Sequence, residues 1–107
     1  MDITLEPVNF NISQELNQHV RNMFNKLSKY NDQIVGIDIY MKSLTETEKG
    51  DKTVEAKVFL PGNDVFVTGK GEDFITAAQD CYDVAKRSVS KMKDKVKDRR
   101  EIRNDKG

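Results

Sequence analysis

Apolar residues near the start of the chain first alternate with polar ones and then adopt a helical spacing. Ile3 and Leu5 predict a short strand that either ends at Pro7 or leaves that position unpaired at a sheet edge. Ser13 is a favourable N-cap for the element that follows. The apolar face of that element, with spacings of four and three, consists of Leu16, Val20, Met23, Leu27 and Tyr30. This spacing predicts a helix of about sixteen residues that ends at positions 31–32.

The middle of the chain contains three more alternating segments. Ile37, Ile39 and Met41 predict a second strand after Gly36. The apolar faces of a third and a fourth strand consist of Val54, Ala56, Val58 and Leu60, then Val65 and Val67. The polar segment 43–52 predicts an exposed hairpin loop, and the sequence PGND at 61–64 predicts a turn. Two consecutive hairpins predict an antiparallel meander.

The last third of the chain predicts one long helix, with Glu72 or Asp73 as its N-cap. Gly69 and Gly71 precede it, but the third glycine of a dinucleotide-binding fingerprint is missing, so we interpret the pair as a chain reversal. Cys81 lies on the apolar face of the helix, which favours a buried small residue over a reactive thiol. That face consists of Phe74, Ala78, Cys81, Ala85, Ser88, Met92 and Val96.

These elements predict an α+β fold with the order β-α-β-β-β-α. Because three strands and both helices each have one apolar face, we expect a four-stranded sheet with two helices packed on one side. The other face of the sheet should be more open. The chain has 107 residues, enough for one domain with one core. We expect this domain to span residues 1–98 and residues 99–107 to form a short, charged, flexible tail.

Charge is distributed unevenly along the chain, although the chain as a whole is neutral. Residues 86–107 contain ten basic and four acidic residues, a net charge of +6, so the rest of the chain carries −6. A concentrated positive surface on a small protein indicates a polyanionic partner, most often nucleic acid. A solvated helix face would look equally basic, so charge alone leaves both interpretations open.

The same inventory of residues argues against an enzyme. His19 and Cys81, the one histidine and the one cysteine, cannot form a His/Cys metal cluster, and no hydrolase or phosphate-loop motif occurs. We interpret Asp80 and Asp83 as charges that favour the helix dipole rather than as an acid–base pair. We therefore expect no catalytic residues, metal or cofactor. With no apolar run long enough for a membrane span or a signal peptide, we expect a cytoplasmic protein.

The basic residues of the long helix separate into two flanks when placed at 100° per residue. One flank holds Lys86, Lys93, Lys97 and Arg100, and the other holds Arg87 and Lys91. The first helix adds Lys26 and Lys29 on one side and Arg21 on the opposite side. We expect two helices with basic flanks and a groove that suits phosphate contacts. One alternative is that the aliphatic parts of these lysine and arginine side chains only cover the edge of the core. Another is that Asp83/Arg87 and Lys97/Glu101 form local pairs on the helix.

Three aromatic residues, Tyr40, Phe59 and Phe66, fall on the sheet face opposite the helices. Base stacking, as in RNA-recognition motifs, is one interpretation, but the strand order differs and no such motif sequence occurs. Cross-strand packing that shields the open face is favoured over base stacking. A protein-contact patch is an interpretation intermediate between these two.

Several segments in register resemble the short ribosome hibernation-promoting factors and the related ribosome-associated inhibitor, a bacterial family. Residues 24–30, FNKLSKY, are similar to the family pattern F-x-K-L-x-x-Y, and residues 71–80, GEDFITAAQD, are similar to G-x-D-M-Y-A-A-I-D. Residues 87–97, RSVSKMKDKVK, are similar to R-x-L-x-K-x-K-D-K-L-K. The resemblance begins with the MDITL strand and the NFNISQEL cap region and runs to about residue 98.

This resemblance implies a fold similar to double-stranded RNA-binding domains and a site in the small ribosomal subunit. There, basic residues of both helices would contact 16S rRNA of the 30S subunit or 70S ribosome, in the channel for messenger and transfer RNA. Occupancy of this channel would block translation in starved cells. The residues that match basic positions of the family are Lys26, Arg87, Lys91, Lys93, Lys95 and Lys97. Lys29, Lys86 and Arg100 rest on helical phasing alone.

The chain departs from the family pattern at three places. Pro7 stands where we expect glycine, and Met23 and Val84 occupy positions that are commonly basic. Arg21 and Lys86 are candidates to compensate. Residues 99–107 are too short and polar for the additional domain by which long members dimerise ribosomes, so we expect no self-sufficient ribosome dimerisation. We also expect a monomer off the ribosome. Two rival functions stay open, a general double-stranded RNA-binding module and a protein-interaction adaptor that uses Tyr40, Phe59 and Phe66.

Overall fold

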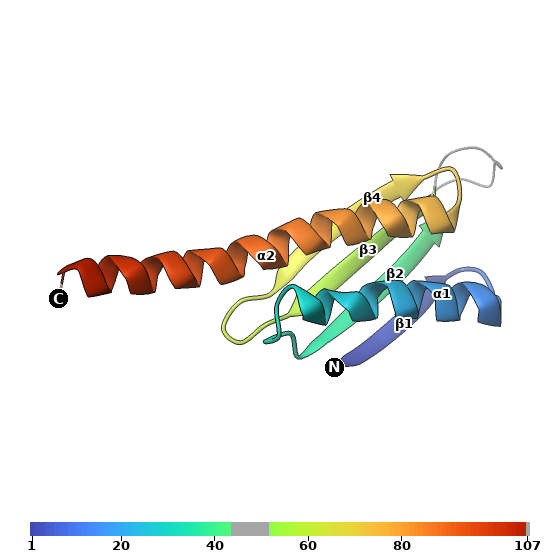
Figure 1. The fold of residues 1–107 in the computed structure, drawn as a ribbon. Coiled ribbons are helices and arrows are strands. Elements are labelled where there is room, and N and C mark those ends of the chain that lie inside the picture. The colour runs from blue at the N-terminus through green and yellow to red at the C-terminus, as the bar shows by residue number, and fades with distance from the viewer. Residues whose placement is uncertain (44–51, 107) are drawn as a thin grey trace.

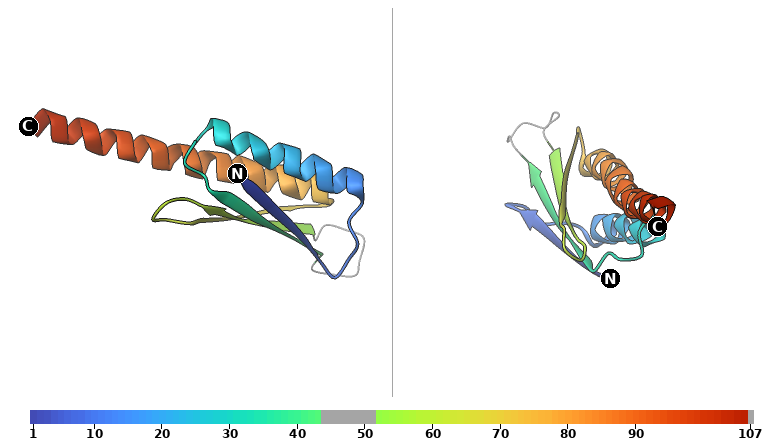
Figure 2. Two further views of the ribbon diagram at one scale, coloured as in Figure 1. Left: turned by 90° about the horizontal axis from the view of Figure 1, so that it is seen from below. Right: turned by 90° about the vertical axis from the view of Figure 1, so that its left-hand side faces the viewer.

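The computed structural model describes the backbone of residues 1–43 and 52–106 and the side chains of residues 1–43 and 52–92. Its elements are β1 (Asp2–Val8), α1 (Gln14–Asn25), a 3-10 helix η1 (Lys26–Lys29), β2 (Gly36–Ser43), β3 (Lys52–Phe59), β4 (Val65–Gly71) and α2 (Phe74–Lys106). Both α-helices lie on one face of the sheet, and no helix of the described residues covers the opposite face (Figures 1 and 2). The predicted α+β class and element order are confirmed.

The sheet has the order β1-β2-β3-β4. β2, β3 and β4 form the predicted antiparallel meander, whereas β1 pairs with β2 in parallel. The parallel pairing follows from the connection, since α1 carries the chain back over the sheet between β1 and β2. Pro7 stays within β1 opposite Met41, and β1 is an edge strand, so the strand does not end at Pro7. Most of the predicted loop 43–52 lies outside the described residues.

The core lies between the helices and one face of the sheet. The alternating residues predicted for the strands supply the sheet side of this core, for example Ile37, Ile39 and Met41 of β2, which are all buried. Phe24 of α1 and Tyr82 of α2 join the two helices through an edge-on ring contact with centroids 5.8 Å apart. The core therefore combines the contacts of each helix with the sheet and the contact between the two helices.

Both helical faces differ in detail from the prediction. α1 has twelve residues and tightens into η1 instead of continuing as one helix of about sixteen. Phe24 is fully buried, whereas Tyr30, predicted for the core, is 39% exposed. In α2 the core takes Tyr82 and Val89, and Ser88 is only partly buried. The faces are rotated because each helix must contact its neighbour helix as well as the sheet, which periodicity alone does not encode.

Gly69 and Gly71 do not form a chain reversal, because both belong to β4. A Cβ atom at Gly69 would lie 2.2 Å from the backbone nitrogen of Cys81 and 2.4 Å from the carbonyl oxygen of Ala77. At Gly71 it would lie 2.8 Å from the nitrogen of Ala77. The two glycines therefore let the α2 backbone lie directly against the strand.

Asp73 is the N-cap of α2, one of the two predicted candidates. Its Oδ1 accepts a hydrogen bond of 2.7 Å from the backbone N–H of Thr76, and this bond lowers the pKa of the Asp73 carboxyl. From this cap the helix runs for 33 residues and projects past the end of the sheet (Figure 1). Its backbone stays helical through Lys106, and the domain boundary at residue 98 remains a prediction.

We predict that Gly69→Ala lowers the free energy of unfolding by about 3 kcal/mol or more, because the added methyl group meets helix backbone atoms that cannot rotate away. Urea unfolding followed by circular dichroism measures this loss.

Gly62→Ala is the matched control. Gly62 has a φ of 78° in the turn before β4, and a Cβ atom added there would meet no other atom within 4 Å. This change therefore adds backbone strain of about 1 kcal/mol without a clash. Equal losses in the two variants would contradict the packing role of Gly69.

Candidate functional site

The end of η1 lies beside the middle of α2, and specific contacts join the two. Lys86 Nζ lies 5.5 Å from the centroid of the Tyr30 ring, a cation–π contact. Asn31, which is buried, donates from Nδ2 to the carbonyl oxygen of Val89 at 3.2 Å. Burial raises the pKa of Tyr82, and the neighbouring Tyr30 raises it further. This junction holds the two helices at a fixed spacing.

Five of the predicted site residues have described side chains, and all lie around this junction on the helix side of the molecule. Lys26 and Lys29 are exposed on η1, Arg87 and Lys91 are exposed on α2, and Lys86 is partly buried at the helix pair. The ion pairs among the described residues involve other lysines, Lys42 and Lys57. We call these five predicted site residues the basic cluster; none of them forms an ion pair among the described residues, and Lys86 also contacts the Tyr30 ring.

The other four predicted residues, Lys93, Lys95, Lys97 and Arg100, lie on the projecting part of α2. Their side chains are outside the described residues. The helical backbone extends the line of basic positions away from the sheet (Figure 1).

A surface hollow of about 500 Å³ lies at the basic cluster. It is lined by Tyr30 and by α2 residues between Val84 and Lys91, among them Lys86, Arg87 and the hydroxyl-bearing Ser88 and Ser90. Lys and Arg can only donate hydrogen bonds, and the hydroxyls can donate as well, so the hollow suits an anion with several oxygen atoms, such as a phosphate. Tyr30 and the two serines were missed from sequence, because Tyr30 fitted the apolar face and the serines carry no charge.

Arg21 serves the fold rather than the basic cluster. Its guanidinium donates to the carbonyl oxygen of Ile3 in β1 at 2.6 Å and to Oδ1 of Asn17 at 2.5 Å. It therefore does not compensate for Met23. Met23 itself is buried in the core, which explains why no basic residue stands there.

The local pair between Asp83 and Arg87, one alternative for these charges, is not formed. Asp83 Oδ1 instead accepts a hydrogen bond of 3.0 Å from Gln79 Nε2, and no ion pair with Arg87 occurs in the described part of the chain. The second expected pair, Lys97/Glu101, lies outside the described side chains. Arg87 is thus free for intermolecular contact.

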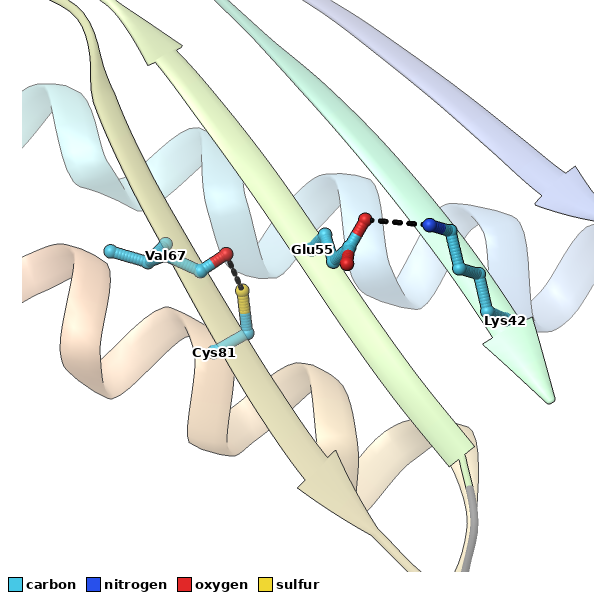
Figure 3. A network of polar contacts seen from close by, with 4 residues as sticks. All are labelled: Lys42, Glu55, Val67 and Cys81. Atoms are coloured by element: carbon cyan, nitrogen blue, oxygen red, sulfur yellow. Dashed lines mark hydrogen bonds and ion pairs between the residues drawn. The ribbon is translucent and has the colours of Figure 1, made fainter. Parts of the chain in front are cut away.

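Cys81 has the environment of a structural thiol. It is fully buried, its Sγ points from α2 toward the carbonyl oxygen of Val67 at 3.9 Å, and burial raises its pKa to about 12, with smaller contributions from Asp80 and Glu55 (Figure 3). A thiol of this kind is almost never the reactive thiolate. Among the described residues no group of three or more potential metal ligands occurs. No helix in the described part is long and apolar enough to cross a membrane.

Comparison with known proteins gives one family and several relatives. Residues 3–97 match the family described as Sigma 54 modulation protein / S30EA ribosomal protein. The chain is 28% identical over 97 residues to the ribosome hibernation promoting factor of Escherichia coli strain K12, which covers 91% of this chain and 98% of that protein. It is 25% identical over 97 residues to the factor of the same name from Acinetobacter guillouiae, with 85% and 86% covered.

Two solved structures share the fold. A ribosomal subunit interface protein from Coxiella burnetii superposes with a TM-score of 0.75 at 22% identity, covering 87% of this chain and 98% of that one. The N-terminal domain of Protein Y from Thermus thermophilus gives 0.74 at 24% identity, with 86% and 99% covered. The similarity to double-stranded RNA-binding domains remains a prediction.

We predict that the thiol of Cys81 reacts with a disulfide reagent such as dithionitrobenzoate far more slowly in the folded protein than in urea at pH 8. The raised pKa also has a consequence for stability. Because the unfolded thiol ionises near its ordinary value of 9.0 and the folded thiol near 12, stability contributed by Cys81 is present below pH 9 and is lost as the pH rises toward 12.

The measurement is the free energy of unfolding of the wild type and of Cys81→Ala at several pH values from 8 to about 11. Every other ionisable group is common to both proteins, so the difference in slope isolates the thiol. Parallel pH profiles, or rapid labelling of the native protein, would contradict the buried assignment.

We further predict that Arg21→Ala lowers the free energy of unfolding by about 1.5 kcal/mol, because α1 loses its charged hydrogen bond to the β1 backbone. Lys29→Ala, which removes an exposed charge from the same helical segment, should change it by less than about 0.5 kcal/mol. Urea unfolding of both variants checks this, and an unchanged stability of Arg21→Ala would show that the contact is not structural.

Proposed function

The chain belongs to the Sigma 54 modulation protein / S30EA ribosomal protein family, and from this we infer that it is a ribosome-associated translation inhibitor of the hibernation class. The relatives named above are ribosome hibernation promoting factors and ribosomal subunit interface proteins. The single observation on this chain that supports the assignment most is the basic cluster. It groups five cations from two helical elements, three of which (Lys86, Arg87 and Lys91) line one hollow, and none of the five forms an ion pair among the described residues.

We propose that the partner is 16S rRNA of the small subunit, alone or within the 70S ribosome, in the channel for messenger and transfer RNA. The proposed contact residues are Lys26, Lys29, Lys86, Arg87, Lys91, Lys93, Lys95, Lys97 and Arg100. Helix-mounted lysines and arginines suit phosphates, which fix the position of a protein without reading sequence. Bound in that channel, the domain would exclude messenger and transfer RNA by occupying their volume, with no chemical step and no cofactor.

The shape of α2 supports binding along an extended RNA surface. A helix of 33 residues is about 50 Å long, and its second half projects from the sheet as a rod with basic positions. The first turns of the same helix carry exposed acidic residues, including Asp80 and Asp83. Because RNA repels these residues and attracts the other end, the charge distribution would orient the protein as it approaches the ribosome.

The remaining parts of the proposal concern the free protein. We propose a monomer off the ribosome, located in the cytoplasm, with residues 1–98 as the ribosome-binding domain. A free double-stranded RNA-binding module is the main rival, and it would bind naked duplexes as tightly as assembled subunits.

We predict that Arg87→Glu combined with Lys91→Glu weakens binding to 30S and 70S particles by more than about tenfold and leaves the fold intact, because both side chains are exposed and form no ion pair in the described part of the chain. Binding is measured by co-sedimentation over a series of salt concentrations. Wild-type affinity should fall linearly with salt on logarithmic axes, and the double variant should reduce that slope by about two.

The control is Lys42→Glu combined with Lys70→Glu, which makes the same change of charge on the opposite face of the sheet. It breaks one surface ion pair, Lys42–Glu55, worth less than about 1 kcal/mol. Full ribosome binding by the folded Arg87/Lys91 variant, or wild-type binding that does not weaken with salt, would overturn the assigned interface. Equal affinity for a naked RNA duplex would favour the rival module.

A further inference from the structure

The sheet face opposite the helices carries a compact aromatic site, which we define as Tyr40, Lys57, Phe59 and Phe66. Lys57 Nζ lies 5.0 Å from the ring centroid of Phe59 and also 5.0 Å from that of Phe66. The Phe66 side chain is nevertheless 74% exposed, the largest exposed fraction among the large hydrophobic residues of the described chain. A cation is thus held between two rings, one of which is open to solvent.

The strand register places most of this site in two rows across β2, β3 and β4, while Phe59 lies outside them, opposite Gly36. Asp38, Lys57 and Phe66 are opposite one another in the first row, and Tyr40, Glu55 and Thr68 in the second. A hollow of about 190 Å³ lies between the rows and is lined by Tyr40, Glu55, Lys57, Phe66 and Thr68 together with two core positions of β3 and β4. Two aromatic rings, a cation, a carboxylate and two hydroxyls therefore surround one small space.

Phe66 packs against its cross-strand neighbour Lys57 but not against another aromatic ring, and most of its side chain stays exposed. The ring–ring contacts in the described structure are Phe10 with Phe74 and Phe24 with Tyr82, all on the helix side or at the core. On the open face Phe59 and Phe66 are instead connected through Lys57. The Phe66 ring gains little burial there, so its position is not explained by the packing of the sheet.

The chemistry of the site distinguishes between possible occupants. The centre of a protein–protein interface is depleted of charge, and a stable interface buries about 800 Å² on each partner. Here charged residues stand in the middle of the face, including Lys57 and the pair Lys42–Glu55 at 2.9 Å (Figure 3). A nucleobase needs only one small space, a ring to stack on, and donors and acceptors around its edge.

We propose that the aromatic site takes one unpaired base of the ribosomal RNA, stacked on Phe66. Lys57, Tyr40 and Thr68 can donate hydrogen bonds to ring nitrogens, carbonyl oxygens or a neighbouring phosphate, and Glu55 can accept from an exocyclic amine. This inference rests on the proposed function, because it assumes the same partner as the basic cluster.

The consequence is a protein with two separate RNA contacts. The helices and the aromatic site lie on opposite faces of the sheet, so the base comes from a different RNA segment from the phosphates at the basic cluster (Figure 2). The basic cluster supplies affinity that depends on salt, whereas stacking on Phe66 depends on it much less.

Three substitutions at Phe66 test the proposal. Because the ring is exposed, we expect all three variants to fold, and thermal unfolding verifies this. The first probe is a mixed-sequence single-stranded hexaribonucleotide, titrated while amide shifts of β3 and β4 are followed by nuclear magnetic resonance. We expect Phe66→Ala and Phe66→Leu to weaken binding by roughly five- to a hundred-fold and Phe66→Tyr to retain it, since only an aromatic ring stacks on a base.

The second readout is chemical probing of rRNA bases with dimethyl sulfate in ribosomes saturated with each variant. We expect a base that is protected by the wild type and by Phe66→Tyr but is exposed with Phe66→Ala and Phe66→Leu. Phosphate contacts at the basic cluster should be unchanged, so the variants still sediment with ribosomes.

The outcomes separate this inference from the proposed function. Unchanged oligonucleotide binding and unchanged base protection in Phe66→Ala would overturn the stacking site while the ribosome assignment stands. Retention by Phe66→Leu with loss in Phe66→Ala would also overturn it, because that pattern indicates an apolar contact that needs no aromatic ring. A wild-type protein that binds no ribosomes would overturn the proposed function, and the oligonucleotide titration would still decide whether the aromatic site binds bases.

Discussion

The direct packing of the α2 backbone on β4 is the contact on which the rest of the structure depends. Gly69 makes it possible, since a Cβ atom there would lie 2.2 Å from the nitrogen of Cys81. With the helix this close to the sheet, small residues such as Ala77, Ala78 and Ala85 can fill the space between them and are fully buried. The same closeness excludes water from Cys81, which is why burial raises its pKa. One missing side chain therefore determines the composition of a whole helical face.

The position of α2 in turn determines where the charges stand. Tyr82 and Val89 face the first helix, so Lys86, one turn after Tyr82, comes to lie against the Tyr30 ring. Arg87 and Lys91 then point away from the core and have no acidic partner in the described chain. Because helix α1 shortens into η1, its last lysines reach the same junction. The proposed binding surface for a polyanion thus results from core packing, without a loop devoted to it.

The two faces of the sheet have different chemistry. The helix face concentrates cations that are free for phosphates, whereas on the open face Lys42 and Lys57 are paired with Glu55 and Asp64. What the open face offers instead is an exposed ring with a cation beside it. In the proposed position in an RNA-lined channel the protein would meet RNA on more than one side, and the two surfaces would contact different parts of the RNA, the backbone or a base.

The sequence by itself determined the element order, the inward residues of the strands, the N-caps and the concentration of positive charge, because these follow from local periodicity and composition. Tertiary structure alone decided how the helices are rotated, with Phe24, Tyr82 and Val89 in the core and Tyr30 at the surface. It also assigned Arg21 to the β1 backbone and Gly69 to the helix contact, two roles that look like a binding charge and a turn in the sequence. The physical reason is that a side chain's role depends on which neighbour the fold brings to it. Arg21 and Ile3 are 18 positions apart in the sequence, and Cys81 and Gly69 are 12 apart, so each pair meets only after the chain has folded.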